Sequence, residues 1–422
     1  MERYREYKDS GVQWLREIPR HWKEERAKYL YKKEQRPIED GDEIVTCFRD
    51  GEVTLRRNRR TTGFTEATDY SHYQHICKGD LVIHQMDAFA GSSGVSDSDG
   101  MGTPVLSVCT GLTEKTNNYY FAHILRLMGW NGYILSLYRG IRERSSDFRF
   151  DTFSKLWLPL PPLSEQHAIV SYLDDKCGKI DKMLEGKQKQ IELLAEMKQR
   201  IIADAVTRGL NPDVKMKATN IPWLPEIPEH WTVKPIRAIL RENNEKSETG
   251  TEELLSLSQY TGVSRKKDAG KTGMFEAENT IGYKKVHPGQ FVMNIMLAWN
   301  GSYAVSGLEG IISPAYCVFD FISNDNKMYY NYLWRLSVYQ GAFKTESRGI
   351  IDSRLRLYPN KFLPFPTICP PLDEQDSIVS YITKKTSKID TLTSKLQQEI
   401  ESIKEYKQRL ISDVVTGQIK VC

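Results

Sequence analysis

The chain has 422 residues, of which 40% are hydrophobic and 10% aromatic, enough for substantial cores and too many for a disordered chain. Its formal net charge of +4, from 59 basic and 55 acidic side chains, is too small to identify a binding partner. The charged start MERYREYKDS predicts no secretory signal, and no apolar run approaches ~18 residues, so we expect no membrane span.

The cysteines indicate a reducing environment. There are seven, an odd number, and none belongs to a CxxC pair. We therefore expect free thiols and a cytoplasmic protein rather than a disulfide framework or a zinc ribbon. The positions are Cys47, Cys77, Cys109, Cys177, Cys317, Cys369 and Cys422.

Residues 1–160 are predicted to form a first globular domain of short strands and turns. The apolar run 81–86 follows a glycine turn and has the composition of a buried strand. The segment RRNRR at 56–60 places four arginines in five residues, and such clusters attract nucleic-acid phosphates. Gln, Arg and His can also read base edges in a major groove. The DNA-binding candidates here are Arg56, Arg57, Arg59, Arg60, Gln74, His75, Arg142 and Arg144.

The pattern changes to a helix in residues 161–209. Ser164 is a good helix N-cap, Glu165 places an anion in the first turn, and Gly209 is a natural C-terminal stop. The helix between them is about 44 residues, or roughly 66 Å, long. Its apolar residues recur with the heptad spacing of a coiled coil. The predicted helix-pairing residues are Ile169, Leu173, Ile180, Met183, Leu194 and Ile201.

A linker, 210–220, leads to a second globular domain, 221–369. Its apolar run 290–296 also follows a glycine turn and predicts a buried strand. Basic residues cluster again. One basic run is usually only a solvated surface, so a cluster in each domain is better evidence for phosphate contacts. The DNA-binding candidates here are Arg265, Lys266, Lys267, Lys271, Lys284, Lys285 and Arg348.

Residues 370–422 predict a second long helix with the same signals. Asp373 is its expected N-cap, Glu374 lies in the first turn, and Gly417 is the expected stop. One apolar stripe on each helix suits a two-helix coiled coil better than two helices that each lie on their own domain, because a small domain cannot cover so long a helix. The pairing residues in this helix are Ile378, Ile382, Ile389, Leu392, Ile403 and Leu410.

The two halves of the chain repeat each other. WLREIPRHW at 14–22 returns as WLPEIPEHW at 223–231, and PPLSEQHAIVSY at 161–172 returns as PPLDEQDSIVSY at 370–381. The middle of each half matches more weakly. This divergence is either neutral drift in loops or, as we favour, the mark of two modules of one fold that bind two different things.

The connections predict how the helices pair. Only about ten residues join the first helix to the second domain, so the second helix should start where the first one ends. The two helices then run antiparallel as a coiled coil. We therefore predict an α+β fold in which they separate two similar mixed α/β domains, a dumbbell with a pseudo-two-fold axis and with neighbouring chain termini.

Catalytic motifs in the sequence are incomplete. Gly270-Lys271-Thr272 lacks the first glycine of a phosphate-binding loop, and Asn211-Pro212-Asp213 lacks the second proline and the aromatic residue of an amino-methyltransferase motif. His72 and His75 stand three residues apart, and we take neither a cysteine nor a third histidine to complete a metal site with this pair. We therefore predict no catalytic residue, no metal and no cofactor in this chain.

The repeated motifs resemble a known family. Two globular domains, each followed by a PPLxEQxxIVxY segment and a long helix, are similar to the specificity subunit of type I restriction-modification enzymes. The segments at 161–166 and 370–375 resemble the openings of that family's central and C-terminal conserved regions, and those at 14–22 and 223–231 resemble its domain starts. The resemblance covers nearly the whole chain.

The resemblance implies a non-catalytic DNA-recognition role. Each globular domain would be a target-recognition domain for one half of a split sequence in double-stranded DNA. The helices would set the gap between the halves and hold two methyltransferase subunits, with motor-endonuclease subunits as further partners. S-adenosylmethionine, ATP and Mg²⁺ would be bound by those partners.

Two other classes stay open on the sequence. A self-contained methyltransferase or nuclease would need cofactor or metal motifs. A structural coiled-coil adaptor without DNA binding would not need a basic cluster in each domain.

Overall fold

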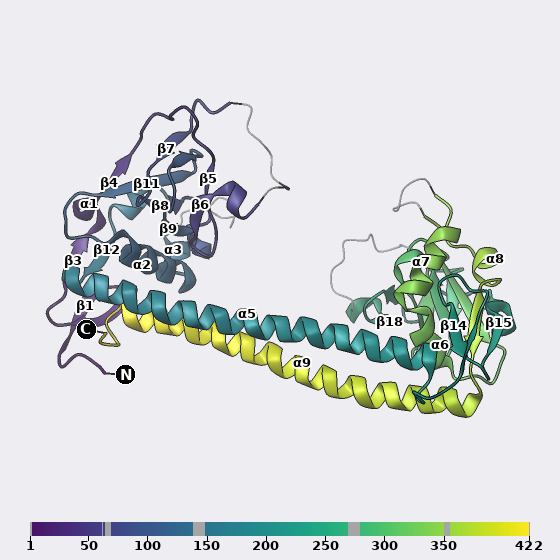
Figure 1. Ribbon diagram of the computed structural model, residues 1–422. Helices are drawn as coiled ribbons and strands as arrows, with labels where there is room; N and C mark the ends of the chain where they lie inside the picture. Colours follow the sequence, from purple (N-terminus) through teal and green to yellow (C-terminus); the bar gives the residue numbers. More distant parts are fainter. Residues whose placement is uncertain are drawn as a thin grey trace. The chain divides into compact units, whose positions relative to one another are not determined.

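The computed structural model describes residues 2–60, 62–63, 69–137, 148–268, 279–349 and 355–421. The chain forms two compact units (Figure 1). The first comprises Met1–Gln188 and Gln397–Cys422, and the second comprises Lys189–Leu396. The boundary between units therefore falls inside the two long helices, so each unit contains one globular domain and a part of both helices.

The first unit mixes strands with short helices and turns. Its strands are β1 Tyr7–Val12, β2 Leu15–Pro19, β3 Lys23–Arg26, β4 Tyr31–Glu34, β5 Val45–Cys47, β6 Val53–Leu55, β7 Gln74–Ile76, β8 Leu81–His84, β9 Ser93–Val95, β10 Gly100–Gly102, β11 Leu106–Gly111 and β12 Trp157–Leu160. Its helices and 3-10 turns are α1 Ala27–Leu30, η1 Arg56–Asn58, η2 Ala88–Ala90, α2 Asn118–Trp130, α3 Tyr133–Ser136 and α4 Phe150–Phe153.

The second unit has the same order of elements through its sheets. Its strands are β13 Met216–Ala218, β14 Glu226–Pro228, β15 Thr232–Pro235, β16 Leu240–Asn243, β17 Leu255–Ser258, β18 Gly262–Arg265, β19 Lys284–Val286, β20 Phe291–Asn294, β21 Tyr303–Val305, β22 Gly310–Ile312, β23 Tyr316–Phe321 and β24 Pro366–Cys369. Its helices and 3-10 turns are η4 Ile236–Ala238, η5 Lys266–Asp268, η6 Ala298–Asn300, α6 Lys327–Trp334, α7 Ser337–Glu346 and α8 Pro359–Phe362.

A four-stranded antiparallel sheet lies at the centre of each unit, in the order β4-β11-β8-β9 in the first and β16-β23-β20-β21 in the second. Both apolar runs predicted as buried strands lie here, as β8 and β20. Leu81 and Ile83 of β8 join the larger core, while Val82 joins a smaller core. Successive side chains of a strand point to opposite faces, so a sheet covered on both faces needs an uninterrupted apolar run.

The smaller core is covered by two antiparallel strand pairs that recur in both units. The pairs are β5-β6 and β7-β10 in the first unit, and β17-β18 and β19-β22 in the second. Gly100 faces Ile76 and Gly310 faces Val286, so the register is the same when 210 is added to each residue number. The middle regions, in which the sequence repeat is weak, therefore share one fold.

The long helices are α5, Leu163–Arg208, and α9, Leu372–Val415. Each starts one residue before Ser164 or Asp373, so these two residues lie inside the first turn and the N-cap prediction is corrected. The reason is the preceding Pro162 or Pro371, whose carbonyl already accepts the first backbone hydrogen bond. The predicted stops are confirmed, since Gly209 and Gly417 take left-handed φ values of 77° and 74°.

The repeated motifs form a joint between each domain and its long helix. Glu165 accepts a hydrogen bond from Trp22 Nε1 at 2.9 Å and lies 2.6 Å from His21 Nε2. In the second unit Glu374 accepts one from Trp231 Nε1, also at 2.9 Å. The HW and EQ segments therefore recur together because they bond to each other.

The glutamine of each motif fastens a second element. Gln166 Oε1 accepts the Asn117 N–H at 2.8 Å, and Gln375 Oε1 accepts the Asn326 N–H at 2.8 Å. These two asparagines cap α2 and α6 through their side-chain oxygens. The start of each long helix is thereby fixed to the first helix after the central sheet.

Ion pairs show that α5 and α9 run antiparallel in the first unit and lie side by side in the second. In the first unit Asp181 pairs with Lys407 at 2.6 Å, and Lys187 pairs with Glu399 at 2.5 Å, so the numbers rise in α5 as they fall in α9. In the second unit Lys198 pairs with Asp390 at 2.6 Å. Figure 1 shows the two helices alongside each other in each unit, α5 in teal and α9 in yellow. The predicted antiparallel direction is confirmed.

The heptad stripe is wrong in the middle of both helices. Met183 and Leu392 are 55% and 47% exposed, and Leu184 and Thr393 lie half-buried instead. The least exposed positions of α5 advance 36 residues in ten steps from Ile169 to Ala205, which is 3.6 residues per step. A heptad repeat assumes 3.5, so a straight helix drifts ~20° per heptad and turns these residues away from the seam.

The other ten predicted pairing residues are buried or half-buried. They are Ile169, Leu173, Ile180, Leu194, Ile201, Ile378, Ile382, Ile389, Ile403 and Leu410. Those nearest the domains, such as Ile169 and Ile378, join the globular cores rather than a seam alone.

The shift of the stripe predicts a difference between two neighbouring residues. Leu184→Ala should lower the free energy of unfolding by about 1–2 kcal/mol, roughly half of the cost for a fully buried leucine. Met183→Ala should change it by less than about 0.5 kcal/mol, because that side chain already contacts solvent. Urea unfolding of both variants measures the difference, and equal destabilisation by the two would restore the heptad assignment.

The two chain termini lie together in the first unit, as predicted. The Lys420 N–H donates to the Glu2 carbonyl at 2.9 Å, and the Tyr7 hydroxyl donates to the Gly417 carbonyl at 2.9 Å. Figure 1 marks both ends beside β1. The end of α9 thus meets the first domain as the end of α5 meets the second. The Tyr120 hydroxyl donates to the Val415 carbonyl, and the equivalent Tyr329 hydroxyl donates to the Val206 carbonyl.

The connection between α5 and the second domain is shorter than predicted. Within the expected linker 210–220, Met216–Ala218 forms β13 and pairs with β14. The linker residues on either side of β13, 210–215 and 219–220, are in neither a helix nor a strand.

This arrangement predicts that the chain tolerates circular permutation. Opening it after Asn211 and joining Cys422 to Met1 through a short flexible linker should leave the melting temperature within a few degrees, because Asn211 is exposed outside regular structure and Glu2 already bonds to Lys420. The same joining with a new opening at Gly186, inside α5, should lower it strongly. Circular dichroism melts compare the two, and an equally low melting temperature in both permutants would contradict the closure.

Among the described helices, none combines the length and the apolar character that a membrane crossing requires. The six described cysteines are free thiols.

Candidate nucleic-acid interface

The arginine cluster of the first unit lies at the end of the β5-β6 pair. Arg56 and Arg57 belong to the 3-10 turn η1, and Arg59 and Arg60 follow it. Arg57, Arg59 and Arg60 are exposed, and Arg56 is half-buried. We call these four residues the first basic turn. Its backbone is fixed because the Arg56 N–H donates to the Ile44 carbonyl at 2.7 Å.

The basic cluster of the second unit occupies the equivalent turn. Arg265 ends β18, and Lys266 and Lys267 lie in η5. The Lys266 N–H donates to the Leu254 carbonyl at 2.8 Å, the same bond shifted by 210 residues. We call Arg265, Lys266 and Lys267 the second basic turn. The repeat motifs did not align these clusters; the strand register does.

Acidic side chains partly balance both turns. Arg57 pairs with Glu43 at 2.5 Å, and Lys267 pairs with Glu253 at 3.1 Å, an equivalent pair in the two units. Arg59 also lies between Asp50 and Glu52, at 2.7 and 2.8 Å. These pairs are solvent-exposed, so each contributes little to stability and can exchange for a phosphate.

Two predicted base-reading residues are corrected. Gln74 and His75 lie in β7, only 6% and 7% exposed. Gln74 Nε2 donates to the Leu106 carbonyl at 2.8 Å, and His75 Nδ1 lies 2.9 Å from Asp42. In the sequence they lie near a basic cluster. In the structure β7 lies between β10 and Arg36, and neither side chain faces solvent.

Lys284 and Lys285 of β19 occupy the places equivalent to Gln74 and His75. Lys284 lies 3.6 Å from Glu242, and its side chain is only 12% exposed. Lys285 lies 3.1 Å from Glu245, and this hydrogen bond raises the pKa of the ammonium. Their charges are engaged within the unit, which weakens the prediction of phosphate contacts by these two lysines.

Arg348 is exposed, and its backbone forms a two-way bridge with Arg356. Three predicted residues, Arg142, Arg144 and Lys271, lie outside the described residues. Tyr260, in the β17-β18 turn, is 83% exposed, and its aromatic ring can stack on a base.

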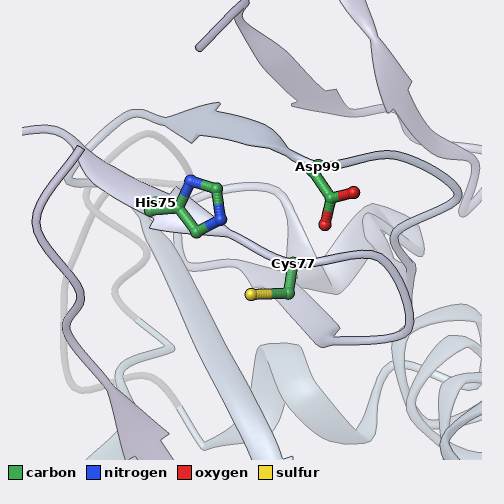
Figure 2. Close-up of side chains that lie close together, drawn as sticks. All are labelled: His75, Cys77 and Asp99. Carbon is green, nitrogen blue, oxygen red and sulfur yellow. The ribbon is translucent and has the colours of Figure 1, made fainter. Parts of the chain in front are cut away.

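The structure also brings together a group that the sequence did not reveal. His75, Cys77 and Asp99 offer ligand atoms that all lie within 4.8 Å of one another (Figure 2). The sequence spacing pairs His75 with His72, the wrong neighbour. Positions 75 and 77 share a strand face, and Asp99 arrives from the loop before β10, so only the strand pairing reveals the cluster.

The side chains around the Cys77 thiol are mainly negatively charged. Burial raises the pKa of this thiol, and the charges of Asp80, Asp99 and Glu39 raise it further, while Arg36 opposes them. Arg36 is held by Asp80 at 2.5 Å.

Comparison with known proteins supports the predicted resemblance. No family model matches the chain. The specificity subunit of the type I restriction enzyme MjaVIII from Methanocaldococcus jannaschii is 26% identical in an alignment of 292 residues that covers 64% of this chain. The chain thus spans 63% of the length of that relative.

Two solved structures have the same fold. A chain from a type I R-M system, solved to explain complex assembly and conformational transition, matches with a TM-score of 0.67, 14% identity, and coverage of 95% of this chain and 99% of that one. The HsdS subunit from Thermoanaerobacter tengcongensis matches with a TM-score of 0.50, 15% identity, and coverage of 95% and 98%. The resemblance to type I specificity subunits predicted from the repeated motifs is therefore confirmed.

Proposed function

We propose that this chain, which is similar in sequence and in fold to type I specificity subunits, is the sequence-specific DNA-binding subunit of a type I restriction-modification complex. Each globular domain reads one half of a bipartite target in double-stranded DNA. The observation that carries the proposal is the basic turn placed at the same position of the same fold in both units.

Phosphate contacts supply affinity and orientation, and other side chains supply specificity. The two basic turns hold seven cationic side chains on backbone fixed by equivalent hydrogen bonds. The residues next to the two basic turns differ between the units. In the second unit they include the exposed Tyr260. This combination suits two modules that grip DNA in one way and read different sequences.

The chain itself performs no catalysis in this proposal. S-adenosylmethionine, ATP and Mg²⁺ belong to partner subunits, two methyltransferase subunits that dock on α5 and α9 and further motor-endonuclease subunits. The exposed apolar side chains of the helices, among them Met183, Leu193, Met197, Leu392 and Tyr406, are available for such docking.

Three measurements on purified protein test the proposal and its alternatives. In gel-shift titrations we use fragments of genomic DNA from the source cell, in methylated and unmethylated form. Once methyltransferase subunits are added, the binding should depend on the DNA sequence. Titration calorimetry of the chain alone should detect no S-adenosylmethionine binding. A chain that binds this cofactor alone is a self-contained methyltransferase, and one that binds no DNA in any complex is a structural adaptor.

A further inference from the structure

His75, Cys77 and Asp99 form a group with three different metal-binding chemistries. An imidazole nitrogen, a thiol sulfur and a carboxylate oxygen all lie within 4.8 Å of one another. His75 and Cys77 come from β7 and the turn after it, and Asp99 comes from the loop before β10. In Figure 2 the imidazole ring points toward the other two side chains, with one ring nitrogen on that side.

A carboxylate fixes the orientation of this imidazole. His75 Nδ1 lies 2.9 Å from one oxygen of Asp42 and 3.1 Å from the other. The Asp42 side chain is only 9% exposed. Nδ1 therefore holds its proton toward Asp42, which leaves the lone pair on Nε2. Carboxylate–histidine pairs of this kind orient the histidine ligand of many zinc sites and raise its basicity.

The charges around the group favour a cation. Four carboxylates surround it, from Glu39, Asp42, Asp80 and Asp99. Arg36 balances Asp80 through contacts at 2.5 and 3.3 Å. Asp99 receives one backbone hydrogen bond, from the Lys78 N–H at 2.8 Å, and keeps a second oxygen.

The second unit offers an internal comparison. By strand register, Lys285, His287 and Glu309 stand where the first unit has His75, Cys77 and Asp99. There the chain supplies its own cation. Lys285 pairs with Glu245 at 3.1 Å, and His287 lies 3.2 Å from Glu245 and 3.7 Å from Glu309. The first unit keeps the acidic surroundings but has no lysine at this place.

We propose that the first unit binds one zinc ion through His75 Nε2, the Cys77 thiolate and an Asp99 oxygen. Nitrogen, thiolate and carboxylate together suit Zn²⁺, and three protein ligands leave a fourth position for water. Binding replaces the thiol proton of Cys77 with the metal and releases that proton to solvent. The ion joins the β7 turn to the loop that precedes β10.

The place of this link gives the ion a structural role. The loop before β10 lies against β6, since Ser96 bridges Val53, and β10 itself lies against the residue before β5, since Met101 bridges Ile44. Ile44 also accepts the hydrogen bond that fixes the first basic turn. A zinc ion at this point therefore stabilises the support of that turn. The proposal concerns metal binding and does not depend on the proposed DNA-binding function.

The test uses the full-length chain, reduced and stripped of metal with a chelator. Co²⁺ serves as the spectroscopic probe because Zn²⁺ has no d–d absorption. We expect one Co²⁺ per chain, with a thiolate charge-transfer band, displaced by one Zn²⁺. Cys77→Ser should abolish the charge-transfer band, Asp99→Asn should weaken Co²⁺ binding at least about tenfold, and Asp42→Asn should weaken it about 10–100-fold.

Matched variants separate a site from adventitious binding. His287→Gln, at the place equivalent to Cys77, and Cys317→Ser, a buried thiol of the second unit, should leave the stoichiometry and the band unchanged. Asp99 is exposed, so Asp99→Asn should fold even where a change at Cys77 does not. A band that survives Cys77→Ser, binding unaffected by Asp99→Asn, or no stoichiometric binding to the wild-type chain would overturn the proposal.

Discussion

Replacing the four residues of the first basic turn by alanine should weaken binding to one half of the DNA target. For every phosphate that the protein no longer neutralises, the slope of log K against log salt should become shallower by about 0.9, so the four replacements give up to about 3.6. Replacing Arg265, Lys266 and Lys267 should act on the other half and give up to about 2.7. Because Arg57, Arg59 and Lys267 already have acidic partners, the measured changes should fall below these limits.

The measurement is a salt series of DNA-binding isotherms on targets in which one half-site at a time is scrambled. A matched control removes four exposed basic residues of the first unit away from the turn, Arg16, Arg20, Lys28 and Lys155, and should leave the slope nearly unchanged. If an arginine of the turn also reads guanine, discrimination at its half-site should fall by about 1–3 kcal/mol per base. Equal effects of both basic turns on both half-sites would rule out independent reading domains.

Lengthening both long helices should lengthen the preferred gap between the half-sites. Duplicating residues 184–190 in α5 and 393–399 in α9 adds seven residues to each, about 10 Å of helix. This corresponds to about three base pairs at ~3.4 Å per step. Three base pairs also turn the duplex by roughly 100°, so we expect the gap to change and the affinity to fall.

A longer matched insertion should recover the affinity. Adding 25 residues to each helix extends it by about 37 Å, close to one turn of DNA, so the preferred gap should increase by about 11 base pairs with both half-sites in phase. A single-helix insertion is the control, because it breaks the pairing seen in Lys187–Glu399 and Lys198–Asp390. Binding by oligonucleotides with graded gaps measures the outcome. An unchanged optimum in both double insertions would mean that the helices do not measure the DNA.

The structure explains where local signals were sufficient. The apolar runs of β8 and β20, the helices α5 and α9, and the glycine stops at Gly209 and Gly417 follow from neighbouring residues alone. Their physical causes are strand burial on both faces, helical periodicity and the left-handed turn that glycine permits. The short connection between the first helix and the second domain also predicted the pairing direction, and the repeat then predicted the neighbouring termini, since a duplicated joint imposes the same connection twice.

Small errors in a local rule grew with distance along the helix. A spacing of 3.5 residues places Ile169 and Leu173 correctly, but after two heptads it places Met183 on the seam instead of Leu184. The deviation is ~20° per heptad. Nothing in the sequence near residue 183 marks this shift, because Met183 and Leu184 are both apolar. Only the observed burial decides between them.

By itself, the sequence determined the repeat, the order of domains and helices, and the resemblance to specificity subunits. Only the tertiary structure decided which distant residues meet. Strand pairing aligned the two basic turns, withdrew Gln74 and His75 from the surface, and brought Asp99 to His75 and Cys77. These contacts join residues more than twenty positions apart, and their register depends on packing between strands, which no local pattern of charge or hydrophobicity encodes.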